Sequence, residues 1–184
     1  MAVTRDIPRA WIEPRRTVAE LLARGPSERV AFAYLAAASI LGFVSQLPRL
    51  VRESRTANAG FDEALAREAG EAGMVVTDLG ATKFEALVSG ALMGWIFLMP
   101  LVMYLLAWLL HGLARLLGGR GTGLRVRVAV FFSFLAVTPA LLLLGLTSGF
   151  VGPGPAETLV GLVLVSAFIW IALGAVHAAE TPNA

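Results

Sequence analysis

The chain has 184 residues, of which 57% are hydrophobic and only 15% are charged, and its mean hydropathy is +0.75. Soluble domains carry about 25% charged residues. A soluble core could not enclose this much apolar side chain, so the composition predicts a polytopic helical membrane protein. Fourteen Arg and one Lys flank the apolar stretches and do not form one basic face, which argues against nucleic acid as a partner. The absence of Cys excludes disulfides, thiolate metal sites and a Cys nucleophile.

The first predicted element is an amphipathic N-terminal segment, residues 1–29, which we expect on the cytoplasmic side. Its charges leave no uninterrupted apolar stretch for a cleavable signal peptide. Apolar residues at near-helical spacing predict a helix from Pro14 to Arg24, with Gly25 as its stop. We expect the segment to lie on anionic lipid through Trp11, Val18, Leu21 and Leu22, with headgroup contacts from Arg9, Arg15 and Arg16. The alternative is a basic tail that only sets the membrane orientation.

Residues 30–184 form the predicted transmembrane domain, an all-α bundle of four helices. A stretch of about 20 residues without charge is long enough to cross a hydrocarbon core of about 30 Å. The predicted spans are residues 30–47, 86–110, 128–150 and 159–176. We expect Pro48 to end the first span and Pro100 to kink the second, because proline removes a backbone hydrogen bond.

The loop between the first two spans, residues 50–83, is polar and charged. Within it Phe61, Leu65 and Ala69 recur at helical spacing. This pattern predicts a short extramembrane helix from Asn58 to Ala69 that rests on the bilayer or on the bundle.

Two pairs of glycines predict how the second and third spans pack. Gly90 and Gly94 lie four residues apart in the second span, and Gly145 and Gly149 do so in the third. Because paired small residues let helix backbones approach closely, we expect the two pairs to meet in an antiparallel hairpin. A Leu at position 94 would then splay the hairpin.

The distribution of basic residues predicts the orientation in the membrane. With a cytoplasmic N-terminus, ten Arg face inward, and five basic residues lie in the long outer loop. Since Arg and Lys concentrate on the cytoplasmic side, both termini are expected inside. Arg49, Arg52 and Arg55, directly behind the first span, oppose this assignment.

Few residues suggest chemistry. None of the predicted spans holds a charged residue, which argues against an ion-coupled transporter. His111 and His177 could meet at the inner ends of their spans, but a lipid contact is expected more often there than haem or metal ligation. The Gly118–Gly123 turn lacks the Lys-Ser/Thr of a phosphate-binding loop. We therefore predict no catalytic, cofactor or metal site, and headgroup contacts from Arg120, Arg125 and Arg127.

Two runs resemble a known family. A helix ends in the turn Gly118-Gly-Arg-Gly-Thr-Gly, and a span follows in which Ser133 precedes Pro139 by six residues. These runs, with Trp11-Ile-Glu-Pro-Arg and Gly149-Phe-Val-Gly-Pro-Gly-Pro, resemble the Yip1 domain family and its proteobacterial branch. The resemblance implies a small multi-span protein of the bacterial inner membrane with a cytoplasmic N-terminal region. Eukaryotic members act with small GTPases in vesicle traffic through an acidic Gly/Pro motif that is absent here, so that role and its residues do not transfer.

Two functions fit the sequence. The first is a non-catalytic membrane-organising protein or accessory subunit that binds anionic lipid, a larger membrane complex or further copies of itself. The second is a small channel or a lipid or solute transporter, with Pro100 and Pro139 as hinges.

Overall fold

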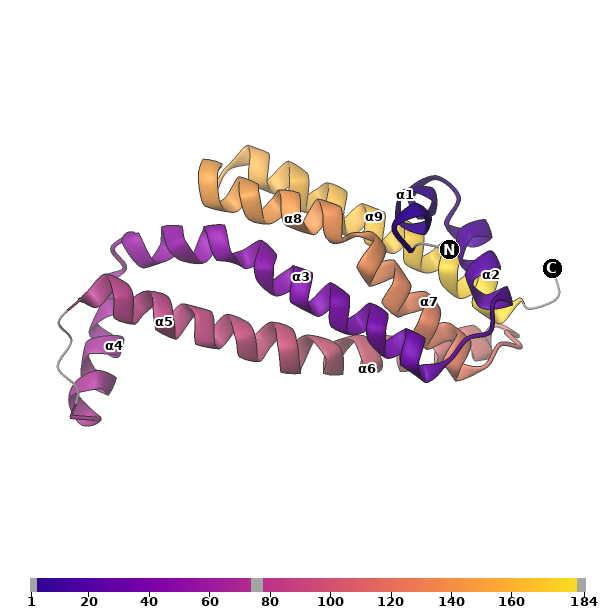
Figure 1. Cartoon of the computed structure of the whole chain (residues 1–184), viewed down its shortest axis with the longest axis horizontal. Coiled ribbons are helices and arrows are strands. Elements are labelled where there is room, and N and C mark those ends of the chain that lie inside the picture. The colour runs from indigo at the N-terminus through magenta and orange to yellow at the C-terminus, as the bar shows by residue number, and fades with distance from the viewer. Residues whose placement is uncertain (1–2, 74–77, 182–184) are drawn as a thin grey trace.

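A computed structural model describes residues 3–73 and 78–181. The described chain is helical, and its four longest helical stretches form an elongated bundle (Figure 1). In chain order the helices are α1 (Val3–Ile12), α2 (Pro14–Ala23), α3 (Glu28–Arg55), α4 (Ala59–Glu71), α5 (Leu79–Leu92), the π-helical turn η1 (Met93–Leu98), α6 (Met99–Leu116), α7 (Gly123–Ala136), α8 (Thr138–Leu146), the π-helical turn η2 (Thr147–Val151) and α9 (Pro155–Glu180).

Four stretches are long and apolar enough to cross a membrane, as predicted. They are α3 with 28 residues, α5–α6 with 38, α7–η2 with 29 and α9 with 26. Each extends beyond its predicted span. In particular, α3 continues through Pro48 to Arg55, so the expectation that Pro48 ends the helix is wrong. A proline inside a membrane helix is tolerated where neighbours pack around it, and Gly149 of η2 packs directly against Pro48.

The third span occupies the centre of the bundle. Helix α7 packs against α3, α6, α9 and the N-terminal helices. Its Phe131 and Phe132 are fully buried. Tyr104 of α6 meets the Phe131 ring edge-on at 4.9 Å between centroids, and Tyr34 of α3 meets Phe132 at 5.6 Å. Aromatic rings therefore fill the middle of the protein.

The third span breaks where Pro139 has no N–H to donate to the carbonyl of Leu135. The chain changes direction between α7 and α8 (Figure 1). Two side chains supply donors at this break. The Thr138 hydroxyl donates to the Leu135 carbonyl, and the Trp11 indole donates to the Ala136 carbonyl, both at 2.8 Å. The bend is thus stabilised by polar contacts that replace helical hydrogen bonds in an apolar interior.

The second span contains Pro100 without a break in the helix. The turn η1 ends two residues before Pro100, and its C-cap Met99 donates its N–H to the Gly94 carbonyl, five residues back. A π turn of this kind accommodates a local mismatch without ending the helix. The helical stretch from Leu79 to Leu116 therefore remains continuous.

The N-terminal segment packs onto the bundle. It forms two helices, α1 and α2, that lie against α7 and α9 (Figure 1). Val18, Leu21 and Leu22 are buried there. Trp11 is packed against the same core, and its indole is bonded to α7. Val18, Leu21 and Leu22 thus face the bundle in the folded protein, because an amphipathic face fits a groove between helices as well as it fits a lipid surface. Lipid contact by the partly buried Trp11 stays a prediction.

An ion pair closes this N-terminal hairpin. Arg24 Nη1 lies 3.0 Å from Oδ2 of the buried Asp6, and this hydrogen bond raises the pKa of Arg24 above its ordinary value. Helices α1 and α2 share one end of the bundle with the 117–122 turn and the end of α9 (Figure 1).

The extramembrane helix of the long loop is confirmed. Helix α4 begins at its cap Asn58, whose side chain accepts a hydrogen bond from the Phe61 N–H at 3.3 Å. Lys83 of α5 holds α4 in place, because its buried ammonium donates to Asp62 at 2.5 Å and to the Thr56 carbonyl at 2.7 Å. This ammonium lowers the pKa of Asp62. A single basic side chain therefore fixes the loop helix at the far end of the bundle.

Candidate functional site

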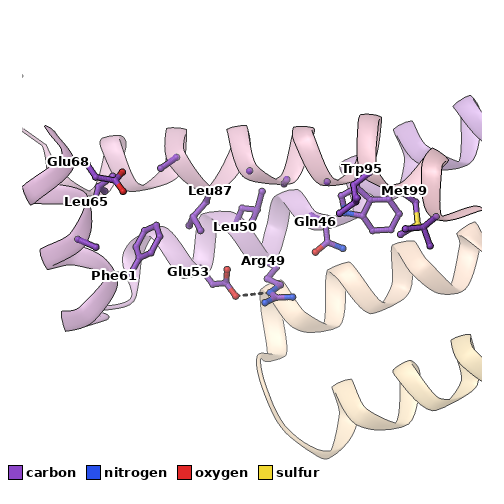
Figure 2. Close-up of a pocket in the computed structure, with 17 residues that line it drawn as sticks. Gln46, Arg49, Leu50, Glu53, Phe61, Leu65, Glu68, Leu87, Trp95 and Met99 are labelled. Carbon is purple, nitrogen blue, oxygen red and sulfur yellow. Dashed lines mark hydrogen bonds and ion pairs between the residues drawn. The ribbon is translucent and has the colours of Figure 1, made fainter. Parts of the chain in front are cut away.

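A groove between the first and second spans is the best candidate for a functional site. We call it the glycine groove (Figure 2). It has a volume of about 680 Å³ and lies between α3, α4 and the α5–η1–α6 stretch. Its lining residues are Gln46, Arg49, Leu50, Glu53, Phe61, Ala64, Leu65, Glu68, Ala86, Leu87, Gly90, Ala91, Gly94, Trp95, Leu98, Met99 and Val102.

Both glycines that line the groove are uncovered. A methyl group added at Gly90 or Gly94 would have no heavy atom within 4 Å. At Gly42, by contrast, it would collide with the Trp95 ring, so this glycine is needed for α3 and the second span to approach each other. Trp95 also stacks on Phe134 of α7 at 6.3 Å between centroids. The groove therefore has an aromatic wall at one end and an open glycine surface beside it.

The rim of the groove is polar at the end that carries α4. Arg49 and Glu53 of α3 form an ion pair at 2.7 Å, and Gln46 lies one turn before Arg49 (Figure 2). Phe61, Leu65 and Glu68 of α4 border the same end (Figure 2). The site can thus accept an apolar segment along the spans and a polar group at the membrane surface.

The predicted contact between the two glycine pairs is wrong. Gly145 lies against the backbone of Ser45, and Gly149 lies against Pro48, so both pack on α3. No contact joins α5 or η1 to α8 or η2 among the described residues. The bend at Pro139 directs the outer half of the third span along α3. A glycine pair indicates close approach by some helix but does not specify which one.

Most of the arginines predicted to bind headgroups have partners within the protein. Arg125 Nε donates to the Ala179 carbonyl at 3.1 Å, and Arg127 pairs with Glu28. Arg9 pairs with Glu20 at 3.1 Å, and Arg16 with Glu13 and Glu20. Arg15 and Arg120 are exposed. Headgroup contact by these residues stays a prediction, and Arg15 and Arg120 are best placed for it.

The two histidines have different surroundings, because His177 is exposed whereas His111 is partly buried beside Glu180. His111 Nδ1 lies 2.7 Å from Glu180 Oε1, and the Gly121 N–H donates to Glu180 Oε2 at 2.7 Å. The buried Glu180 ties the 117–122 turn to the end of α9. A side chain at Gly119 would collide with this carboxylate, which explains one glycine of the turn. This role could not be predicted from the sequence, because Glu180 lies in a stretch that resembles a short polar tail.

No cluster of three or more His, Asp or Glu that could hold a metal occurs in residues 3–73 and 78–181. Two hydroxyls in the middle of the central span bond to its own backbone. Ser133 donates to the Ala129 carbonyl, and Thr138 to the Leu135 carbonyl, at 2.8 Å each.

Comparison with known families agrees with the helical layout. The Yip1 domain model matches residues 9–184, nearly the whole chain. The chain belongs to the Yip1 domain family. The match extends over all four spans of this Yip1-domain protein, α2 and the glycine groove. No curated protein and no solved structure matches the chain.

Proposed function

We propose that this Yip1-domain protein is a non-catalytic accessory subunit of the bacterial inner membrane that binds a transmembrane helix of a partner protein in the glycine groove. The observation that carries the proposal is the free space over Gly90 and Gly94. Association of helices in lipid depends on close packing, and small residues at i and i+4 permit it.

The contrast with the other glycines supports the same proposal. Gly42, Gly145 and Gly149 are all covered by atoms of neighbouring helices. The groove glycines lie in the same bundle without such a cover. A partner helix over Gly90 and Gly94 would make contacts of the kind that the covered glycines already make within the chain.

Packing at the centre of the bundle favours this function over a channel through a single copy. Phe131, Phe132 and Val130 of α7 are fully buried between the other spans. Conduction along this axis would require the aromatic core to separate, at a cost of several kcal/mol for rings of this size.

A cytoplasmic location of both termini is part of the proposal. Two of the three arginines that opposed this orientation are engaged in local contacts, since Arg49 pairs with Glu53 and Arg52 donates to the Ser148 carbonyl at 3.2 Å, whereas Arg55 is exposed. Arg15 and Arg120, by contrast, are exposed at the end that carries both terminal helices. An excess of arginine is expected on the cytoplasmic side of a membrane protein.

Site-specific photo-crosslinking tests the proposal. A photoreactive amino acid at Ala91, which lines the groove, should give one defined adduct with another membrane protein in native membranes. Gly94→Leu should abolish the adduct by filling the groove, and it should leave the thermal stability of the purified protein unchanged because the site is open.

Gly112→Leu is the matched control, because Gly112 also has open space around it but does not line the groove. It should keep the adduct. An adduct with a second copy of the chain would identify the occupant of the groove as another copy of this protein. Lipid adducts alone, or an adduct that survives Gly94→Leu, would contradict the proposal.

A further inference from the structure

A second groove lies on the membrane-facing side between α6 and α9. It has a volume of about 1090 Å³. Its lining residues are Leu106, Leu110, Leu113, Ala114, Leu117, Gly118, Gly119, Arg120, Phe168, Ile169, Ala172, Leu173, Val176, His177, Glu180 and Thr181. We call it the interhelical groove. It shares no lining residue with the glycine groove.

The interhelical groove is apolar along its length and open to the side. It extends along α6 from Leu106 to the C-cap Leu117, which corresponds to a rise of about 16 Å. Leu113 is 56% exposed, and Leu173 on the opposite wall is 62% exposed. In a membrane-spanning stretch, side chains with this exposure face lipid.

Only one end of the interhelical groove is polar. Arg120, His177, Glu180 and Thr181 gather there, at the end of the bundle that holds the 117–122 turn and α2. The Glu180 carboxylate is buried and bonded to His111 and to the Gly121 N–H. Arg120 is exposed, so among the described residues at this end its guanidinium is the permanent positive charge presented to a ligand.

These dimensions identify the kind of occupant. A groove about 16 Å long covers half of a hydrocarbon core of about 30 Å, which is one leaflet. A transmembrane helix would need the full thickness and about 20 residues. An amphiphile of one leaflet needs an apolar channel of this length and a polar site at the membrane surface.

We propose that the interhelical groove binds one phospholipid, with an acyl chain between α6 and α9 and the phosphate at Arg120. Arginine suits this position because its guanidinium donates two hydrogen bonds to a phosphate in a fixed geometry. The bound lipid would fill the space between two helices that are both poorly covered by the rest of the chain. This site goes beyond the proposed partner binding and does not depend on it.

Native mass spectrometry of the protein purified in mild detergent from its native membrane tests the proposal. The wild-type chain should carry one retained phospholipid. Leu113→Trp should fill the groove and lower the retained fraction at least about tenfold, which corresponds to about 1.4 kcal/mol. Leu109→Trp is the matched control, because Leu109 is 52% exposed one turn away and does not line the groove.

Arg120→Glu tests the headgroup site without changing the apolar wall. Loss of a charge-assisted hydrogen bond should reduce retention about tenfold. Arg115→Glu should retain the lipid, since Arg115 is exposed at the same end but does not line the groove.

Absence of a phospholipid from the wild-type chain, or equal retention in all four variants, would overturn the proposal. Gly94→Leu should leave lipid retention unchanged, so a failure of partner binding and a failure of lipid binding give different results. A co-purified protein that Leu113→Trp displaces, with no lipid bound, would assign the groove to a partner helix and also overturn the proposal.

Discussion

The second and third spans are both nearly free of charge, yet they occupy opposite environments. In the most apolar stretch of the third span 78% of the residues are buried, and in that of the second only 11% are. The two helices would be indistinguishable to a hydropathy scan. Their difference teaches that apolar character places a helix in the membrane but does not place it within the bundle.

The physical reason is that lipid chains are as apolar as leucine. Moving a leucine from lipid into the protein gives no hydrophobic gain, so packing shape decides which helix becomes central. Phe131, Phe132 and Phe134 of α7 make edge-on or stacked contacts with rings of the other three spans. The second span instead presents Phe97 and Trp108 outward. Specific aromatic contacts thus separate a core helix from a peripheral one.

Removing one phenyl ring from each span gives the strongest test of this difference. Phe132→Ala should create a cavity in the core and cost about 3 kcal/mol or more, which corresponds to a fall in melting temperature of about 6–12 °C. Phe97→Ala should change stability by about 0.5 kcal/mol or less, because Phe97 is 68% exposed. Thermal unfolding in one detergent measures both. Equal effects would mean that the third span is not the core helix.

The contact between Trp11 and the break in α7 gives a smaller effect. Trp11→Phe keeps an aromatic ring but leaves the Ala136 carbonyl without its indole donor. A buried unsatisfied carbonyl costs about 1–3 kcal/mol. Trypsin should therefore cleave faster at Arg15 and Arg16 as the N-terminal hairpin detaches more often.

Trp108→Phe is the matched control for this change, since Trp108 is 70% exposed on the second span. It should leave the cleavage rate unchanged. If Trp11→Phe is cleaved at the wild-type rate, the indole hydrogen bond does not hold the hairpin.

The smallest effect concerns the start of the second span, where α4 is held by Lys83. The hydrogen bond from Lys83 lowers the pKa of Asp62, so the stabilisation is fully present above the unfolded pKa of about 3.9. It is lost as the pH falls through the lower folded pKa. Amide hydrogen exchange of α4, corrected for intrinsic rates, should show loss of protection over this acidic range.

Asp62→Asn should weaken this protection at neutral pH and remove its acid dependence. Glu63→Gln is the control, because Glu63 is exposed on the same helix. An unchanged acid dependence in Asp62→Asn would assign the titration to another group.

The sequence predicted the elements of this fold better than their contacts. Stretches without charge identified the four spans, and Asn58 identified the start of α4, because both signals are local. The contact of Trp11 with α7 could not be predicted, because its partner, the Ala136 carbonyl, lacks a helical donor only at a break 125 residues further along the chain. The spacing of Gly90 and Gly94 drew attention to the helix surface that borders the glycine groove, but their predicted partner was wrong.

The same limit applies at the end of α9. Glu180 is a lone carboxylate in sequence, and its burial depends on His111, 69 residues away, and on the backbone of the 117–122 turn. The interhelical groove likewise depends on the spacing between α6 and α9, which no periodicity within either helix encodes. Of the residues that line this groove, the sequence predicts lipid headgroup contact for Arg120 and His177, because both lie next to a span.

The docking of α2 on α9 has a consequence for biogenesis. Residues 14–23 leave the ribosome before any of the four spans, whereas the helix that receives them, Pro155–Glu180, is synthesised after the other three spans. At about 5–20 residues per second, the N-terminal hairpin waits for roughly ten seconds or more before its binding surface exists. Its apolar face must be accommodated elsewhere in that interval, and an anionic membrane surface suits a helix that carries Arg15 and Arg16. Lipid contact by this segment would then be a stage in assembly that ends when α9 is inserted and α2 docks on it.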